Sequence, residues 1–466
     1  MTSALWTFDE LVAATGGTLT GGGQGASADG VTFDSRSLQP GDIFLALQGA
    51  RDGHDFVPQA FASGAAIAVT RRPIEGGACL LVPDVQKALE AMAVFARDRA
   101  PACKRGAVTG SVGKTSVTQM VMQGLLRAGR AHSAIKSFNN HIGVPLTLAR
   151  MPRETERAVF EIGMNHANEI TPLSEFVAPH AVVITTVGAV HTENFPDGEA
   201  GVARAKAEIL DGLVPGGLAI LNADNPWFDY LSTCARGAGA LVSAFGEGGG
   251  VDARLTGHVI DGDRAHVTAK FHGRDVAFSL NHTGRHQAVN AMATLLMLEA
   301  LDVDLDTGIA ALEGFAALDG RGKVARVAFG DGDITVIDES YNANPVSMTA
   351  TLASLGEREG GRKLAVLTDM LELGPDEAAL HAGLKDAVEA SGAAQVYLAG
   401  PLMKALWDAL PDRLRGAYAA TAAELLPMVK QGLQGGDIVM IKGSNGSKAG
   451  LIAKALLSPD HHQAAS

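Results

Sequence analysis

Apolar runs alternate with amphipathic segments through the middle of the chain, from residue 105 to residue 225. Four runs are almost continuously apolar, as is typical of strands buried on both faces: 106–109, 158–163, 181–187 and 218–222. Between them, apolar residues recur three and four positions apart, which predicts a helix through Val117 and Leu125 and further helices near 168–177 and 199–213. Repeated strand–helix units predict a parallel sheet covered by helices on both faces.

The pattern changes on either side of this region. Before it, short strand-like runs at 43–47 and 66–69 are separated by glycine-rich turns. Asp84 then has the character of a helix N-cap, and the helical face that follows ends before Pro101. After the central region, residues 252–280 alternate apolar and polar positions, which predicts antiparallel hairpins.

A second series of strand–helix units begins after Gly320, with strands expected at 334–338, 363–368, 394–399 and 437–442. The fold class is therefore α/β, with three domains. We expect a small mixed α/β N-terminal domain at 1–83, a central domain with a parallel sheet and antiparallel hairpins at 84–316, and a C-terminal doubly wound domain at 317–466.

Charge and composition exclude several classes of protein. The 466-residue chain has a formal net charge of −13, whereas nucleic-acid-binding proteins usually carry a basic face. Its three cysteines form no C-x-x-C pair, so neither a disulfide framework nor a zinc site is expected. The N-terminus lacks a signal-peptide pattern, and the longest apolar run, 288–301, is too short for a membrane span. We expect a cytoplasmic protein with no nucleic-acid partner and no membrane span.

A candidate phosphate-binding loop joins the first central strand to its helix. The sequence T-G-S-V-G-K-T-S resembles a P-loop that is shortened at its front, because Val108 stands where the standard motif has its first glycine. Backbone N–H groups at a helix N-terminus attract an anion, a lysine adds charge, and the next hydroxyl is a ligand for Mg²⁺. The alternative is an ordinary strand–turn–helix junction. The predicted nucleotide-binding residues are Thr109, Gly110, Ser111, Val112, Gly113, Lys114, Thr115 and Ser116, which makes the central domain P-loop-type.

Two further polar residues follow central strands. Glu161 ends one apolar run and His191 follows another. Ligands bind at the carboxyl ends of strands in open α/β sheets, so these residues are candidates to complete a Mg²⁺ site beside Thr115. Taken singly, Glu161 is equally well explained as a capping or surface residue, and His191 as a hydrogen-bonded loop histidine.

The segment D-E-S-Y-N-A-N-P, residues 338–345, concentrates polar groups where a strand ends and Pro345 begins a helix. Together with the phosphate loop and T-T-V-G-A-V-H-T-E at 185–193, it resembles the ATP-dependent Mur ligases of peptidoglycan synthesis. D-S-R at 34–36, P-G-D-I-F-L-A-L at 40–47, D-G-H-D-F at 52–56, N-N-H-I-G-V-P-L-T-L at 139–148 and M-L-E-L-G at 370–374 are also similar to motifs of that family. The resemblance covers nearly the whole chain.

The resemblance implies roles for individual residues. Lys114 would bind phosphates, and Thr115, Glu161 and His191 would surround magnesium. Lys206 matches a lysine that family members carbamylate to hold a second magnesium, although on its own it is better explained as a lysine on a solvated helix face. The catalytic set would be Lys114, His191 and Lys206. Further nucleotide contacts would come from Asn290, Arg321 and Asp338, and substrate contacts from Ser35, Arg36, Asn139, Asn140, Tyr341, Asn342 and Asn344.

The motif Y-N-A-N-P-x-S-M is most similar to the branch of the family that adds D-alanyl-D-alanine to UDP-MurNAc-tripeptide. This implies ATP and Mg²⁺ as cofactors, an acyl-phosphate intermediate and a monomer. The first domain would bind the UDP-substrate, and the third would bind the dipeptide and close on ATP. One alternative is another ligase of this type, adding diaminopimelate or lysine or resembling folylpolyglutamate synthase. A nucleotide-dependent switch without ligase activity is a second.

Three positions depart from the family pattern. Gln287 replaces the first asparagine of G-x-H-N-x-x-N, a residue expected to contact adenine. Thr368 replaces a glycine before D-M-L-E-L-G, close to the expected dipeptide pocket. Asn445-Gly446 replaces a basic residue after Lys-Gly-Ser.

Overall fold

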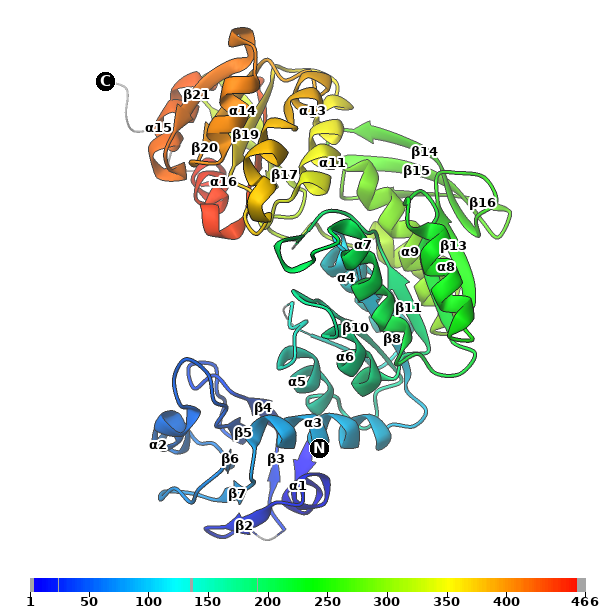
Figure 1. Ribbon diagram of the computed structural model, residues 1–466, viewed down its shortest axis with the longest axis vertical. Helices are drawn as coiled ribbons and strands as arrows, with labels where there is room; N and C mark the ends of the chain where they lie inside the picture. Colours follow the sequence, from blue (N-terminus) through cyan, green and yellow to red (C-terminus); the bar gives the residue numbers. More distant parts are fainter. Residues whose placement is uncertain (1–3, 24, 135–136, 191, 459–466) are drawn as a thin grey trace.

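The computed structural model describes residues 4–23, 25–134, 137–190 and 192–458. Figure 1 shows three α/β units in chain order along the long axis, with the first and third at opposite ends of a curved molecule. Each unit has a separate sheet with its own hydrophobic clusters. No helix among the described residues combines the length and apolar character needed to cross a membrane.

The N-terminal unit contains a five-stranded sheet in the order β2-β7-β6-β5-β4, parallel except for β2. A two-stranded pair, β1-β3, lies beside it. The strands are β1 (Trp6–Thr7), β2 (Thr18–Thr20), β3 (Ser27–Ala28), β4 (Gly30–Thr32), β5 (Asp42–Leu45), β6 (Ile67–Thr70) and β7 (Cys79–Leu81). The helices are α1 (Phe8–Thr15), the 3₁₀ turn η1 (Gly53–Phe56) and α2 (Val57–Ala62).

Helix α3 (Val85–Asp98) joins the first unit to the second. Asp84 caps it as predicted, because its carboxylate accepts a hydrogen bond from Lys87 N at 3.0 Å. The buried face of α3 belongs to the core of the N-terminal sheet, and Leu146 and Ala149 of α5 (Gly143–Ala149) complete that core. The boundary at residue 83 stays a prediction, and this packing favours a later one, after α3.

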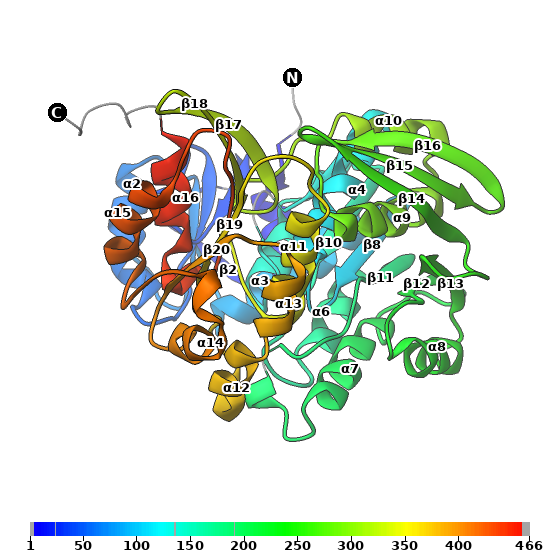
Figure 2. The ribbon, with the colours of Figure 1, turned by 90° about the horizontal axis from the view of Figure 1, so that it is seen from above.

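The central unit is a nine-stranded sheet in the order β16-β15-β14-β13-β12-β11-β8-β10-β9. Strands β8 to β13 pair in parallel, and β14, β15 and β16 form the predicted antiparallel hairpins. Figure 2 shows α4 and α9 on one face of the sheet and α6 and α7 on the other, which matches the two apolar clusters of this unit.

Most predicted central elements are confirmed within a few residues, but the run to 187 leaves the sheet at Ile184, and the helix expected to 213 ends at Ala207 and continues as a 3₁₀ turn. The strands are β8 (Lys104–Thr109), β9 (Ala131–Ser133), β10 (Arg157–Glu161), β11 (Ala181–Ile184), β12 (Leu218–Asn222), β13 (Leu241–Gly246), β14 (Ala253–Asp261), β15 (Arg264–Phe271) and β16 (Arg274–Leu280). The helices are α4 (Lys114–Ala128), α5, α6 (Ile170–Val177), η2 (Thr192–Asn194), α7 (Glu199–Ala207), η3 (Glu208–Leu210), α8 (Phe228–Gly237), α9 (Arg285–Ala300) and α10 (Leu305–Glu313).

The C-terminal unit has six strands in the order β17-β18-β22-β19-β20-β21, parallel except for β17. Strand β22 lies between β18 and β19, so the chain direction across the sheet changes there. In such sheets ligands bind at the carboxyl ends of the strands at this position. The strands are β17 (Lys323–Phe329), β18 (Gly332–Glu339), β19 (Lys363–Thr368), β20 (Gln395–Ala399), β21 (Arg415–Ala419) and β22 (Ile438–Lys442). The helices are α11 (Pro345–Gly356), η4 (Gly374–Asp376), α12 (Glu377–Ala382), α13 (Lys385–Ala390), α14 (Met403–Ala409), η5 (Asp412–Leu414), α15 (Ala422–Gly432), η6 (Asn445–Ser447) and α16 (Ala449–Leu457). The four strands predicted here are confirmed.

Candidate active site

The predicted phosphate loop lies between the central strand β8 and helix α4. Its backbone requires both glycines, because Gly110 and Gly113 have φ angles of 145° and 89°. A Cβ on Gly110 would lie 2.0 Å from Thr185 Oγ1 at the end of the neighbouring strand β11. The strand–turn–helix arrangement and the position of Lys114 at the first turn of α4 are those that anion binding needs.

Residues after β11 hold this loop in place. Ser111 N donates to Thr186 O at 2.8 Å, and Ser111 Oγ both donates to Gly188 O and accepts from Gly188 N. Thr185 Oγ1 donates to Val112 O at 2.5 Å. These contacts explain why the sheet pairing of β11 stops at Ile184: the backbone beyond it binds the loop instead of continuing a strand.

Lys114 folds across its own loop. Its Nζ donates to Gly110 O at 2.6 Å, and burial lowers its pKa below the usual value for a lysine. The charge of Glu161 opposes this shift and that of Arg321 adds to it, so Lys114 lies within electrostatic reach of a residue from the C-terminal unit. A partly desolvated ammonium at the N-terminus of a helix is suited to binding phosphate oxygens.

Glu161, at the end of β10, is the acceptor at the centre of the site. Its two carboxylate oxygens accept hydrogen bonds at 2.7 Å from Thr115 Oγ1, Ser137 Oγ and Asn139 Nδ2. The side chain is only 4% exposed, so Glu161 is neither a surface residue nor a helix cap. The sequence predicted the Thr115–Glu161 pair but not Ser137, which lies two residues before the N-N-H-I-G motif and belongs to no motif of its own.

The fit of this pair to Mg²⁺ follows from its chemistry. A hydroxyl and a carboxylate are hard oxygen ligands, and Mg²⁺ in phosphate-transfer sites commonly binds through one or two carboxylates while keeping several waters. Over residues 4–23, 25–134, 137–190 and 192–458 no group of three His, Cys, Asp or Glu side chains is placed to hold a metal by itself. His191, the third predicted ligand, lies outside the described residues.

Lys206 on α7 is not the solvated lysine that its sequence context favoured. It is 1% exposed, and burial, together with the charge of Lys114, lowers its pKa well below that of an ordinary lysine. A neutral amine is the form that adds to CO₂, so burial prepares Lys206 for the carbamylation that the resemblance implies. The modification itself stays a prediction.

Helix α9 contributes two amides beside the loop. Gln287 Nε2 donates to Ser116 Oγ at 3.5 Å, and Asn290 Nδ2 donates to Gln287 Oε1 at 3.4 Å. Both side chains are buried, and Asn290 lies against Gly113, where a Cβ would come within 3.0 Å of it. The longer glutamine therefore links the phosphate loop to Asn290, and the contact with adenine expected for an asparagine here stays untested.

Residues of the C-terminal unit lie opposite the loop. The buried Asp338 accepts from Gly320 N at 3.0 Å and from Ser340 N and Oγ at 3.1 and 2.6 Å. These bonds fix the turn that carries Arg321, whose guanidinium lies 3.9 Å from the ring centre of Tyr341. Tyr341 is 43% exposed, so its side chain is accessible to a ligand at this face.

The remaining predicted substrate residues have defined partners. Asn342 O accepts from Lys442 Nζ at 3.0 Å. Asn344 Oδ1 accepts from Ser347 N at 2.9 Å and caps α11, and Asn140 Oδ1 accepts from Gly143 N at 2.9 Å at the start of α5. These contacts give Asn344 a structural role as the cap of α11 and Asn140 one in the turn before α5, and their substrate roles stay predictions. In the N-terminal unit, Ser35 is half-buried, and the exposed Arg36 forms two hydrogen bonds with the Asp34 carboxylate.

Lys442 is a further buried charge that sequence reasoning assigned to no role. Its Nζ lies 3.9 Å from Glu339 Oε2. Burial lowers the pKa of Lys442 and raises that of Glu339, and the charge of Arg321 adds to the shift of Lys442. The Lys-Gly-Ser match at 442–444 was the signal that identified this position.

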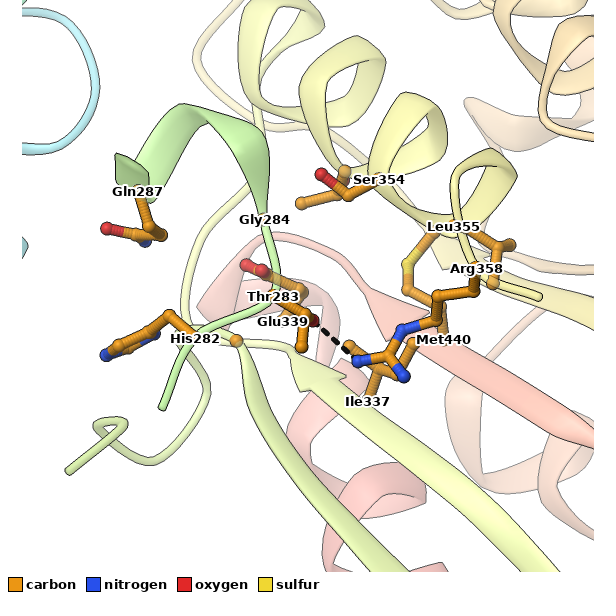
Figure 3. Close-up of a pocket in the computed structure, with 12 residues that line it drawn as sticks. His282, Thr283, Gly284, Gln287, Ile337, Glu339, Ser354, Leu355, Arg358 and Met440 are labelled. Carbon is orange, nitrogen blue, oxygen red and sulfur yellow. Dashed lines mark hydrogen bonds between the residues drawn. The ribbon is translucent and has the colours of Figure 1, made fainter. Parts of the chain in front are cut away.

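A small pocket separates the central unit from the C-terminal unit behind Gln287 (Figure 3). His282 lines it on the central side, stacked on Phe315 with ring centres 5.4 Å apart. Burial lowers the pKa of His282 to about 4. Glu339 and the buried Arg358 line the opposite side.

Comparisons with known proteins agree with this geometry. Models of three Mur ligase domains match consecutive parts of the chain: "Mur ligase family, catalytic domain" at 27–99, "Mur ligase middle domain" at 108–298 and "Mur ligase, glutamate ligase domain" at 320–445. Full-length relatives that are more than 30% identical match as well. The chain belongs to the Mur ligase family and is an ATP-dependent ligase.

Within that family, the similar proteins share one name. The UDP-N-acetylmuramoyl-tripeptide--D-alanyl-D-alanine ligase of Escherichia coli is 34% identical over 445 residues, covering 94% of this chain and 96% of the relative. The enzyme of that name from Bacillus subtilis is 34% identical over 440 residues, covering 92% and 93%. A crystal structure of MurF from Acinetobacter baumannii superposes with a TM-score of 0.86 at 29% identity, covering 97% of this chain and 98% of that one.

Proposed function

We propose that this enzyme joins D-alanyl-D-alanine to UDP-MurNAc-tripeptide, converting ATP to ADP and phosphate and producing UDP-MurNAc-pentapeptide for peptidoglycan synthesis. The names of its full-length relatives support this assignment. The observation that carries it is the facing arrangement of a phosphate loop with Lys114, Thr115 and Glu161 on one unit and Arg321 on the next. None of the three relatives reported above is named for the alternative amino acid or folate substrates.

ATP is the proposed nucleotide. Apart from Ser111 N, which donates to Thr186 O, the amides of residues 110–116 would bind its phosphates together with the ammonium of Lys114, since they sit at the N-terminus of α4. Asn290 would support the loop from α9. Arg321 and the turn fixed by Asp338 would contact the nucleotide from the C-terminal unit.

Mg²⁺ is the proposed metal cofactor: Thr115 and Glu161 would hold one ion, with His191 as a further ligand, and carbamylated Lys206 would hold a second. When bound, it supplies positive charge that offsets the charge of the phosphates. Ser137 and Asn139 orient the Glu161 carboxylate by donating to one of its oxygens.

The residues of the chain act by positioning and electrostatics. The proposed reaction transfers phosphate from ATP to the tripeptide carboxylate, giving an acyl phosphate that the amine of the dipeptide then attacks. Lys114 and Arg321 would stabilise the negative charge that spreads over the transferred group. The ends of β18, β19 and β22 would receive the dipeptide, with Tyr341 and Asn342 at that face.

The UDP part of the acceptor is proposed to bind the N-terminal unit near Ser35 and Arg36. A cytoplasmic location is proposed because the three cysteines, Cys79, Cys103 and Cys234, are free thiols, as is usual in a reducing compartment. We propose that the enzyme acts as a monomer, in line with the resemblance.

Mass spectrometry of the product tests this proposal. The enzyme is incubated with ATP, Mg²⁺, UDP-MurNAc-tripeptide and D-alanyl-D-alanine, and UDP-MurNAc-pentapeptide is expected. Parallel reactions supply diaminopimelate or lysine with UDP-MurNAc-dipeptide. Product in those reactions alone would contradict the proposal and favour the alternative.

A further inference from the structure

The hairpin β14–β15 extends the central sheet away from the phosphate loop, and its turn contacts the C-terminal unit (Figure 1). Arg358, two residues beyond α11, donates from Nη1 to Gly262 O in that turn at 3.1 Å. Its Nη2 donates to Thr283 Oγ1 at 2.5 Å (Figure 3). The preceding residue, Glu357, lies with Oε2 3.4 Å from His258 Nδ1 on β14. The two residues that follow α11, Glu357 and Arg358, therefore both contact the central unit.

The Arg358 contact joins a buried charge to neutral acceptors. Arg358 and Thr283 are 6% and 5% exposed, and burial lowers the pKa of Arg358 to about 10, with Asp263 opposing the shift. Taking a guanidinium out of water is unfavourable unless its hydrogen bonds are remade. Because each acceptor is on the other unit, these two bonds exist only when the units are docked.

The opposite end of α11 lies at the reaction centre. The helix begins at Pro345, directly after the Tyr341–Asn344 segment, and Val346 packs on Gly188, where a Cβ would lie 2.5 Å from Val346 Cγ2. Gly188 is in turn hydrogen-bonded to Ser111 of the phosphate loop. A helix of 12 residues spans about 18 Å. One rigid element thus connects the hairpin to the loop.

We propose that the β14–β15 hairpin is a docking arm for the C-terminal unit and that Arg358 is the positioning residue that engages it. Docking at the far end of α11 sets the position of its near end, and with it Tyr341 and Asn342, relative to the phosphate loop. Arg358 touches neither substrate nor nucleotide. The proposal rests on the proposed function, because its kinetic effect is read out on that reaction.

Substitution of Arg358 tests the proposal. Arg358→Met keeps much of the side-chain volume but removes both donors, and loss of such charge-assisted bonds is expected to lower kcat/KM for D-alanyl-D-alanine by about tenfold or more. Arg358→Lys, which keeps one charged donor group, should restore part of the loss. Arg413→Met is the matched control, because Arg413 is an exposed arginine of the same unit that pairs with Glu389, and it should match the wild type.

Thr283→Val completes a double-mutant cycle. If the two side chains act through their contact, the loss in the double variant will be clearly smaller than the product of the two single losses. Equal kcat/KM in Arg358→Met and Arg413→Met would overturn the proposal. So would a fully multiplicative cycle.

An inter-unit distance separates docking from a general loss of folding. Spin labels are placed at Asp275→Cys on β16 and Lys404→Cys on α14, both exposed, in a Cys234→Ser background. Arg358→Met is expected to broaden the distance distribution while leaving the thermal unfolding midpoint close to that of Arg413→Met. An unchanged distribution would overturn the proposal. This measurement needs no turnover, so it still decides the docking role if the wild type lacks the proposed ligase activity.

Discussion

Glu161 accepts a hydrogen bond from Thr115 at 2.7 Å across 46 residues of sequence. The two residues meet because β8 and β10 are parallel neighbours, with Glu161 in register with Val108, one residue before the phosphate loop begins. This pairing places a carboxylate beside the first turn of α4. The contact between Thr115 and Glu161 in the candidate site is therefore a consequence of strand order.

Lys114→Ala is expected to lower kcat by about a hundredfold or more, because it removes a preorganised positive charge from the phosphate site. Steady-state ADP release measures the effect. Lys404→Ala removes an exposed lysine that pairs with Asp408 on the C-terminal surface and serves as the matched control. Near-normal turnover in Lys114→Ala would refute the assigned role.

Lys206 is expected to carry a carbamate, because burial lowers its pKa and so favours the neutral, nucleophilic form of the amine. In buffer freed of CO₂ and then supplied with ¹³C-bicarbonate, wild-type enzyme should show a ¹³C carbamate signal that Lys206→Arg lacks. Activity should rise as bicarbonate is added back to the wild type only. A carbamate signal of equal size in both proteins would place the modification elsewhere.

His282 is expected to make the enzyme sensitive to acid. Its pKa is about 4 in the folded protein, against an ordinary value of 6.5. As the pH falls, the imidazole therefore becomes protonated in the unfolded chain before it does in the folded protein. Burial of the neutral imidazole therefore contributes fully to the free energy of unfolding above pH 6.5, and this contribution falls as the pH decreases towards 4. At pH 5 the free energy of unfolding should be lower by about 2 kcal/mol. His282→Phe should flatten this part of the stability profile.

Denaturant titration at pH 7.5 and pH 5 measures the difference. His266→Gln, a change at an exposed histidine of β15, is the control and should keep the wild-type slope. An identical loss between the two pH values in wild type and His282→Phe would argue against the assignment.

Thr368 is expected to shape the dipeptide site through Ser447. Their hydroxyls are 2.6 Å apart, and Ser447 Oγ also donates to Ser444 O at 2.6 Å, linking the ends of β19 and β22. Thr368→Val removes one hydrogen-bond partner of Ser447. Loss of such a bond costs about 1 kcal/mol, so KM for D-alanyl-D-alanine should rise several-fold. Ser447→Ala should have a similar effect, and the two should not add. A change in KM for ATP alone would assign Thr368 to a different site.

Helix and turn residues that act over short distances made it possible to predict, from the sequence, the elements that position the site. The loop glycines, the Asp84 cap and Pro345 act within a few residues, so β8, α3 and α11 begin or end close to where they were expected. Short elements such as β9 and α5 were missed because three to seven residues carry little periodicity. The premature end of β11 depends on hydrogen bonds to Ser111, a partner from another strand end.

Interactions between distant segments account for the rest. Burial of Lys206 depends on how α7 packs, and its own helix suggested a solvated lysine instead. The pairing of Lys442 with Asn342 O joins residues 100 positions apart. The sequence did not show that Asn344 caps α11, because several neighbouring polar residues were equally good candidates for substrate contacts. Ser347 N becomes the partner of Asn344 only once α11 forms.

The dependence of ADP release on the dipeptide tests the central claim most directly. Wild-type enzyme, ATP, Mg²⁺ and UDP-MurNAc-tripeptide are mixed with and without D-alanyl-D-alanine, and Lys114→Ala is run alongside. Sustained ADP release that requires the dipeptide and is lost in Lys114→Ala is the predicted result. ADP release at the same rate without the dipeptide would contradict the account.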